Sequence, residues 1–159
     1  MAGSLKALER AIVTLTTTGA SLTTGSAGAA NATADFDARS TGNFPDDFQA
    51  QFELVCQWAT ITSIVANTVA AELYLVPLLD GTNLPDVDLT AGASAIPFSA
   101  YVGAFVCVKA PTAATNMRFI SPTVIFNPML HRPYIIGHAG QTISANWSLK
   151  AVSVQAQYT

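Results

Sequence analysis

Charge is scarce in this sequence. Lys and Arg together number 7 and Asp and Glu 10 among 159 residues, so charged residues make up 11%, whereas soluble proteins carry roughly 25%. A chain with so few charges is neither a charged disordered tail nor a coiled coil. The basic residues are scattered and the net charge is −3. No basic surface is therefore available to neutralise phosphates, and we expect no nucleic-acid partner.

Long apolar runs are also missing, although hydrophobic residues make up 50% of the chain and the mean hydropathy is +0.38. No run approaches the roughly 20 residues of a membrane-spanning helix. Near the N-terminus, Glu9 and Arg10 interrupt the apolar residues where a secretion signal would be continuous. We therefore expect no membrane partner and a protein made in the cytoplasm. Its excess apolar surface is expected to be covered by copies of itself or by another protein.

Cysteine and histidine, which often build metal and catalytic sites, occur only twice each. Cys56 and Cys107 lie in apolar strand-like runs, which favours buried free thiols, with a disulfide between neighbouring strands as the alternative. His131, two residues before a proline, is expected in a surface loop, and His138, between small residues, is expected in a turn. The sequence has no Gly-x-Ser-x-Gly elbow, phosphate-binding glycine loop or Cys/His cluster. We therefore expect no enzyme and no cofactor.

The dominant period of the sequence is two, which is typical of strands with one buried face. Apolar residues alternate with mainly polar ones over 48–58, and shorter copies of this pattern cover 11–16 and 34–39. Further strands are expected at 116–126, broken by a Ser-Pro pair, and at 134–138. About eight short strands without an amphipathic helix indicate an all-β antiparallel sandwich or barrel. The long irregular linkers favour the sandwich.

Two expected strands, 73–79 and 101–108, are apolar on both faces. The outer face of such a strand needs a cover in a two-layer sandwich, and a neighbouring subunit is the simplest one. In the last expected strand, 146–158, one face is formed by Val152, Val154, Ala156 and Tyr158, and Ser153 lies on the opposite face. This pattern predicts a mixed apolar and polar strand.

The low-complexity stretch 16–30 is rich in Thr, Gly and Ala and predicts an extended or flexible loop. The residues before it form either an arm that lies on a neighbour or a frayed terminus. The sequence therefore divides into an N-terminal arm and loop over 1–30 and a sandwich domain over 31–159.

The best candidate ligand-binding segment is the acidic stretch 80–88. Calcium prefers oxygen ligands, which this stretch offers from Asp80, Asn83, Asp86 and Asp88. The spacing does not match an EF-hand, so a turn with solvated acids is favoured and no metal is expected.

The aromatic residues suggest two further readings. Trp58 continues the buried face of its strand and is expected in the core. Trp147 begins a strand, where its indole N–H can reach a backbone carbonyl. An exposed Trp147 or Tyr134 would instead favour a sugar-binding platform.

The segment 71–83, in which a Leu-Tyr-Leu strand ends in Asp-Gly-Thr, resembles a stretch common in small tailed-bacteriophage virion proteins. The segment 140–150 is similar to the final strand of that group, and the Ala/Thr-rich entry into the first alternating strand is similar as well. The resemblance covers 30–158. It implies a jelly-roll capsid decoration or cement protein, often trimeric, without catalytic residues.

From the pattern and the resemblance together, we expect an oligomer that binds the capsid surface of a virion and bridges subunits of the major capsid protein. Expected shell contacts are Leu5, Leu8, Ile12, Thr17 and Thr18. Expected subunit-interface residues are Tyr74, Phe105 and Val106. The alternative is a phage fibre, tail or baseplate module that binds host-surface carbohydrate.

Overall fold

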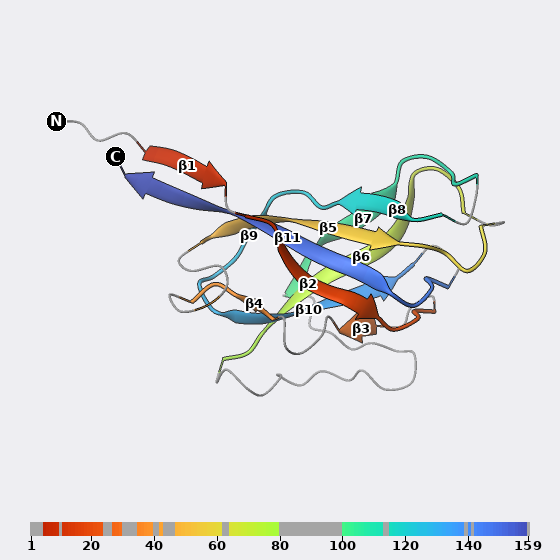
Figure 1. Cartoon of the computed structure of the whole chain (residues 1–159), viewed down its shortest axis with the longest axis horizontal. Coiled ribbons are helices and arrows are strands. Elements are labelled where there is room, and N and C mark those ends of the chain that lie inside the picture. Colours follow the sequence, from red (N-terminus) through yellow and green to blue (C-terminus); the bar gives the residue numbers. More distant parts are fainter. Residues whose placement is uncertain are drawn as a thin grey trace.

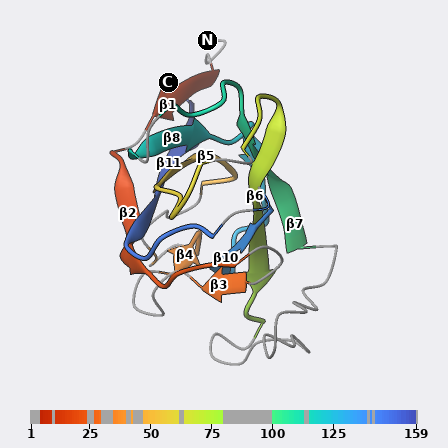
Figure 2. The ribbon, with the colours of Figure 1, turned by 90° about the vertical axis from the view of Figure 1, so that its right-hand side faces the viewer.

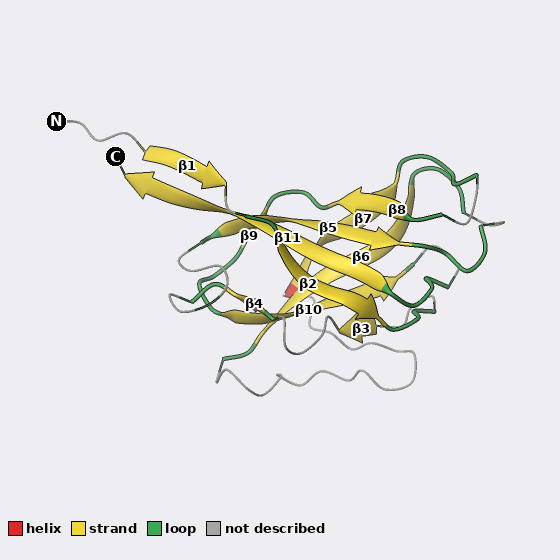
Figure 3. Ribbon diagram, in the orientation of Figure 1, coloured by secondary structure: helices red, strands yellow, loops and turns green. Residues whose placement is uncertain are grey.

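The computed structural model describes residues 5–9, 11–23, 27–29, 35–39, 42, 47–61, 64–79, 100–112, 115–138, 140 and 142–158. Within these residues the chain forms eleven β-strands joined by loops and no α-helix. The short red segment in Figure 3 is a 3₁₀ turn at Ala100. The strands are β1 (Leu5–Glu9), β2 (Val13–Gly19), β3 (Ala27–Ala29), β4 (Phe36–Asp37), β5 (Gln49–Cys56), β6 (Thr68–Pro77), β7 (Tyr101–Cys107), β8 (Met117–Ile120), β9 (Val124–Ile125), β10 (Leu130–Gly137) and β11 (Trp147–Tyr158).

These strands form two antiparallel sheets, which we call sheet 1 and sheet 2. In sheet 1, β11 and β5 pair with each other at the centre. β1 and β2 pair with the other side of β11, and β8 and β9 pair with the other side of β5. In sheet 2, β10 and β6 are central, β3 and β4 pair with β10, and β7 pairs with β6. The end-on view in Figure 2 shows β2, β11 and β5 in one layer and β10, β6 and β7 in the other.

The strand order identifies the topology. If β1 and β2, β3 and β4, and β8 and β9 are each counted as one interrupted strand, each sheet has four strand positions. Neighbouring positions come from distant parts of the chain, as where β11 lies between β2 and β5. Two antiparallel four-position sheets connected in this way form a jelly roll. The prediction of an antiparallel β-sandwich is confirmed.

The core lies between the sheets and follows from the alternation of side chains along the strands. In β5, Ala50, Phe52, Leu54 and Cys56 are buried while the intervening residues are partly or fully exposed, as a period of two requires. Trp58 continues this buried face beyond the strand and packs edge-to-face on Phe119. The predicted alternating strand over 48–58 is therefore confirmed, with Phe48 partly exposed at its start.

In β11 the core-facing side is the one that contains Ser153, not the one that contains Val152 and Val154. Leu149, Ala151 and Ser153 are buried, whereas Val152 and Val154 lie on the outer face of sheet 1. Ser153 is directly opposite Ala50 of β5, and its hydroxyl donates a hydrogen bond to the carboxyl group of the buried Asp47. Because its hydroxyl has a buried hydrogen-bond partner, a serine is tolerated at this core position.

The stretch 16–30 contributes strands to both sheets in the part that the structure describes. β2 runs to Gly19 and pairs with β11, and the side chain of Leu15 is fully buried. β3 pairs with β10 in sheet 2. β3 and β4, which lie on either side of residue 30 in the sequence, both pair with β10. Thr fits a pleated sheet well, so this composition is compatible with edge strands as well as with a loop.

The two ends of the chain form a ribbon that extends beyond the sandwich (Figure 1). β1 pairs with the end of β11, from Glu9 opposite Val154 to Leu5 opposite Tyr158. β5 accompanies β11 only as far as Val154. In the described residues, 155–158 therefore have β1 as their only neighbouring strand. We call this two-stranded segment the terminal ribbon.

Candidate binding surfaces

The outer face of sheet 1 carries a shallow hollow with exposed apolar side chains at its rim. Ile12 is 69% exposed and Ile120 is 67% exposed. The hollow has a volume of about 160 Å³. We call it the sheet 1 hollow, and its lining residues are Ile12, Gln51, Phe52, Glu53, Ile120, Lys150, Ala151 and Val152.

Charges around the hollow are paired. Glu53 lies 3.0 Å from Arg118 Nη1 and 3.6 Å from Lys150 Nζ. The register explains the second pair, because Glu53 and Lys150 are direct cross-strand partners. Partly exposed pairs of this kind contribute little to stability. Of these three charged residues, Glu53 and Lys150 line the hollow together with the exposed Ile12 and Ile120.

The structure separates the predicted shell contacts into two groups. Ile12 lies at the sheet 1 hollow, next to β1, which contains Leu5 and Leu8. Thr17 and Thr18 lie in β2 toward the opposite end of β11, where Gly19 pairs with Trp147. The side chains of Leu5, Leu8, Thr17 and Thr18 lie outside the described part of the structure.

The predicted subunit-interface residues also do not share one environment. Phe105 is fully buried in the core, so its assignment to an interface is wrong. The reason is the alternation along β7, which places Phe105 and Cys107 inward and Val106 outward, where it is 42% exposed. Tyr74 lies half-buried on the outer face of sheet 2.

The outer face of β6 is covered within the single chain to a larger extent than the sequence predicts. Val76 and Tyr134 are buried there and form a small second apolar cluster with Ala100 and Tyr74. This segment therefore needs no neighbouring subunit to bury Val76. On β7 the expected exposure is real, since Val106 and, just beyond the strand, Val108 (78%) are exposed.

Beside this cluster, three polar side chains of sheet 2 converge. The carboxylate of Glu72 accepts a hydrogen bond of 2.8 Å from the hydroxyl of Tyr74, and Nε2 of His138 lies 3.1 Å from the same oxygen. Tyr101 packs edge-to-face on Tyr74 with a centroid distance of 5.4 Å. Burial and the nearby carboxylate raise the pKa of Tyr74 to about 12. Sequence reasoning missed this cluster because Glu72 and His138 are far apart along the chain.

His131 is buried, and the prediction of a surface loop is wrong. It belongs to β10, which begins at Leu130. The rings of Phe36 and Phe126 lie beside it, and its Nδ1 is 3.1 Å from the carbonyl oxygen of Met129. Burial lowers the pKa of His131, because the charged imidazolium is poorly solvated inside the protein.

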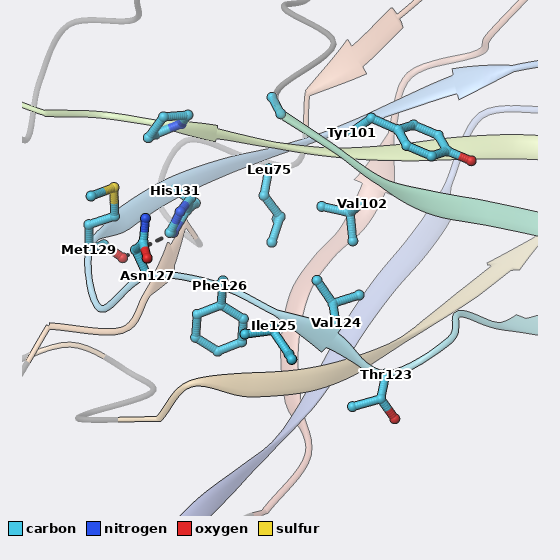
Figure 4. A pocket seen from close by; sticks show the side chains of 12 residues that line it. Leu75, Tyr101, Val102, Thr123, Val124, Ile125, Phe126, Asn127, Met129 and His131 are labelled. Carbon is cyan, nitrogen blue, oxygen red and sulfur yellow. Dashed lines mark hydrogen bonds between the residues drawn. The ribbon is translucent and has the colours of Figure 1, made fainter.

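A larger cleft opens between the sheets, next to His131. Its volume is about 510 Å³. Figure 4 shows Leu75 and Val102 on its sheet 2 side and Val124 and Phe126 on its β9 side. We call it the intersheet cleft. Its remaining lining residues are Pro77, Ala100, Tyr101, Thr123, Ile125, Asn127, Met129 and His131.

Both tryptophans pack inside the sandwich. Trp58 and Trp147 are each 1% exposed, which confirms the core position of Trp58. The predicted bond of Trp147 is present, since its indole N–H donates to the carbonyl oxygen of Ala20 at 2.8 Å. Tyr134 is also 1% exposed. Neither Trp147 nor Tyr134 can therefore serve as an exposed sugar platform.

The cysteines are free and buried, as the sequence predicts. Burial raises the pKa of the Cys56 thiol to about 12 and also raises the pKa of Cys107. Thiols of this kind are poor nucleophiles.

Two acidic side chains of the 34–39 segment are paired with arginine. Asp35 makes two hydrogen bonds of 2.9 Å with Arg132, and Asp37 makes two of 2.8 Å with Arg39. The candidate calcium segment 80–88 lies outside the described residues. In the part of the chain that is described, no group of three His, Cys, Asp or Glu side chains could hold a metal ion, and no helix is long and apolar enough to cross a membrane.

Comparison with protein-family models, with curated proteins and with solved structures finds no match for this chain.

Proposed function

We propose that this chain is a non-enzymatic virion structural protein that decorates the outside of a phage capsid. In this role it self-associates, as a trimer, and bridges subunits of the major capsid protein. The proposal joins the resemblance of the 71–83 and 140–150 segments to phage virion proteins with the jelly-roll topology of the chain. A jelly roll is also used by other proteins, so the surface of this one has to support the assignment.

The observation that carries the proposal is the terminal ribbon together with the adjoining outer face of sheet 1. An isolated two-stranded ribbon is only marginally stable in water. The described residues give residues 155–158 no strand partner except β1, so a docking surface on another chain would stabilise the ribbon. The exposed Ile12 lies between β1 and β2 and leads from the ribbon to the sheet 1 hollow.

The chemistry of this surface fits attachment that is repeated by symmetry. Its exposed apolar side chains are Ile12 and Ile120, and Glu53, the carboxylate that lines the hollow, has two basic partners. Weak apolar contacts of this type gain strength when many copies bind one shell.

The test is binding of the purified full chain to capsids assembled without it, measured by co-sedimentation. We expect binding by the native chain and a loss of at least about tenfold in affinity for Ile12→Lys, since a charge would be desolvated in the contact. Val65→Lys is the matched control, because Val65 is 61% exposed in the loop before β6, away from this face. Equal binding by both variants, or no binding by the native chain, would overturn the proposal.

Carbohydrate binding by a phage fibre, tail or baseplate module is the second candidate function, and a different surface favours it. Tyr101, at 37% exposure, packs edge-to-face on Tyr74, whose hydroxyl donates to the same oxygen of Glu72 that His138 Nε2 approaches. An aromatic ring beside hydrogen-bonding groups is the arrangement that a sugar requires. A glycan array distinguishes the two functions: this candidate predicts a hit that Tyr101→Ala abolishes and Val108→Ala preserves, whereas a decoration protein gives no hit.

A further inference from the structure

His131 is a buried polar side chain with one ring nitrogen that the fold leaves unused. The residue is 6% exposed, and its Nδ1 lies 3.1 Å from the carbonyl oxygen of Met129. A carbonyl oxygen only accepts hydrogen bonds, so Nδ1 carries the proton and donates it to this contact. Burial lowers the pKa of His131 and favours the neutral ring, in which Nε2 then keeps an unshared electron pair. No group in the described part of the chain donates a hydrogen bond to Nε2.

The intersheet cleft gives access to this nitrogen, because His131 lines the cleft (Figure 4). Among the described residues, Nε1 of Trp58 is the only fully enclosed side-chain nitrogen or oxygen without a hydrogen-bond partner. Nε2 of His131, which also lacks a partner, is therefore not enclosed. An acceptor at the wall of a cavity takes its donor from a molecule inside the cavity. In water that donor is a solvent molecule, which a ligand with a matching O–H group can replace.

The walls of the cleft around His131 are apolar. Leu75 and Val102 lie on the sheet 2 side and Val124 on the β9 side. The ring of Phe126, which also lines the cleft, packs edge-to-face on the ring of His131 at a centroid distance of 6.3 Å. An apolar body between these walls would be removed from water on both sides.

The cleft offers no charge that would attract an ion. None of its twelve lining residues is Asp, Glu, Lys or Arg. Asp37, which acts on the ring of His131 from outside this lining, makes an ion pair of 2.8 Å with Arg39. A charged ligand would therefore lose its hydration in the cleft without gaining a counter-ion.

We propose that the intersheet cleft binds a small uncharged alcohol whose hydroxyl group donates a hydrogen bond to Nε2 of His131 and whose apolar body packs between Val102 and Val124. Asn127, at the same cleft, offers an amide group for the ligand oxygen. The volume of about 510 Å³ falls in the range of roughly 300–1,000 Å³ found for ligand sites. The cleft shares no lining residue with the sheet 1 hollow, so this site does not depend on the capsid proposal.

The experiment titrates the isotope-labelled full chain at neutral pH with three probes and follows binding by NMR. The probes are benzyl alcohol, benzyl methyl ether, which keeps the oxygen but lacks the O–H donor, and benzoate, which is charged. We expect the alcohol to bind about three- to tenfold more tightly than the ether, the factor that one hydrogen bond contributes. Benzoate should bind more weakly than either. The nitrogen resonance of Nε2 should shift with the alcohol and not with the ether.

His131→Asn separates the roles of the two ring nitrogens. The asparagine amide N–H replaces Nδ1–H as the donor to the carbonyl oxygen of Met129, and nothing replaces Nε2. In this variant the alcohol and the ether should bind with equal affinity, because the advantage of the hydroxyl depends on Nε2. Val65→Lys, at an exposed position before β6, is the control and should leave the ratio of the two affinities unchanged. Thermal melting checks that both variants fold, and the Nε2 resonance of the native chain decides the question if His131→Asn does not.

Four results would overturn the proposal. The first is the absence of binding by all three probes. The second is equal affinity of the native chain for alcohol and ether without a shift of the Nε2 resonance, and the third is an advantage of the alcohol that a folded His131→Asn retains. The fourth is contact of the bound alcohol with the methyl groups of Ile12 and Ile120 instead of Val102 and Val124, because it would place the ligand in the sheet 1 hollow.

Discussion

At the scale of single residues, the interior of this protein contains polar groups that the alternating pattern does not anticipate. Ser153 and His131 are both buried, and both have hydrogen-bond partners close by. Buried polar groups of this kind stabilise the fold only while the partner is present.

Replacement of Ser153 by alanine should destabilise the chain by about 1–3 kcal/mol, because the buried Asp47 loses a hydrogen-bond donor. The measurement is chemical denaturation at neutral pH. Ser148→Ala is a matched control in the same strand, since Ser148 is only half-buried on the outer face. A destabilisation by Ser153→Ala no larger than that of the control would show that the carboxyl group does not depend on this hydroxyl.

His131 should make the stability depend on pH. Burial lowers its pKa in the folded state, so the unfolded chain binds a proton more readily as the pH falls below roughly 6.5, the usual value of histidine. Its neutral form therefore stabilises the fold fully above that pH, and this contribution is lost toward the lower folded-state pKa. The free energy of unfolding of His131→Phe should fall less between pH 7 and pH 5 than that of the native chain. Parallel pH curves for the two proteins would contradict this expectation.

At the scale of elements, the strands that sequence predicts best are those with one uniformly apolar face. β5 follows the alternation residue by residue, and the Ser-Pro pair at Ser121 correctly separates β8 from β9. β2 and β3 were harder to predict, because Thr, Gly and Ala suit both edge strands and loops. In these elements pairing with a neighbouring strand, rather than local composition, determines the structure.

Candidate sites were predicted less completely than strands, for a related reason. In β7, Phe105 faces the core and its neighbour Val106 faces outward. Because both residues are apolar, their alternation alone does not show which of them is buried. The contact between Glu72 and His138 depends on the pairing of β6 with β10. The intersheet cleft depends on the position of both sheet edges. None of these relations is local in sequence, so each requires the strand order.

Removal of residues 1–10 tests the role of the terminal ribbon as an element. Within the described residues, β1 pairs only with β11, and from Val154 onward. The sandwich should therefore stay folded, with nearly unchanged near-ultraviolet circular dichroism. Self-association in light scattering and capsid binding should both be lost. Unfolding of the truncated chain would show that β1 belongs to the folded core, and retained assembly would show that another surface mediates it.

At the scale of the whole molecule, low charge and exposed apolar residues act together. Only 11% of the residues are charged, and the exposed large apolar side chains include Ile12 and Ile120 on sheet 1 and Ile125 on β9. Contacts between such surfaces arise from the removal of apolar area from water. Salt screens exposed charge pairs but has no comparable effect on apolar contacts.

The proposed trimer should therefore resist changes in ionic strength. We expect light scattering to give the mass of a trimer of the 16.6 kDa chain both at low salt and near 1 M sodium chloride, where the screening length falls to roughly 3 Å. Ile12→Lys should shift the mass toward the monomer and make the remaining association sensitive to salt, because it places a charge of the same sign on every copy. A monomer at both salt concentrations would contradict self-association through this face. A native trimer that dissociates at high salt would assign the interface to ion pairs such as those of Glu53.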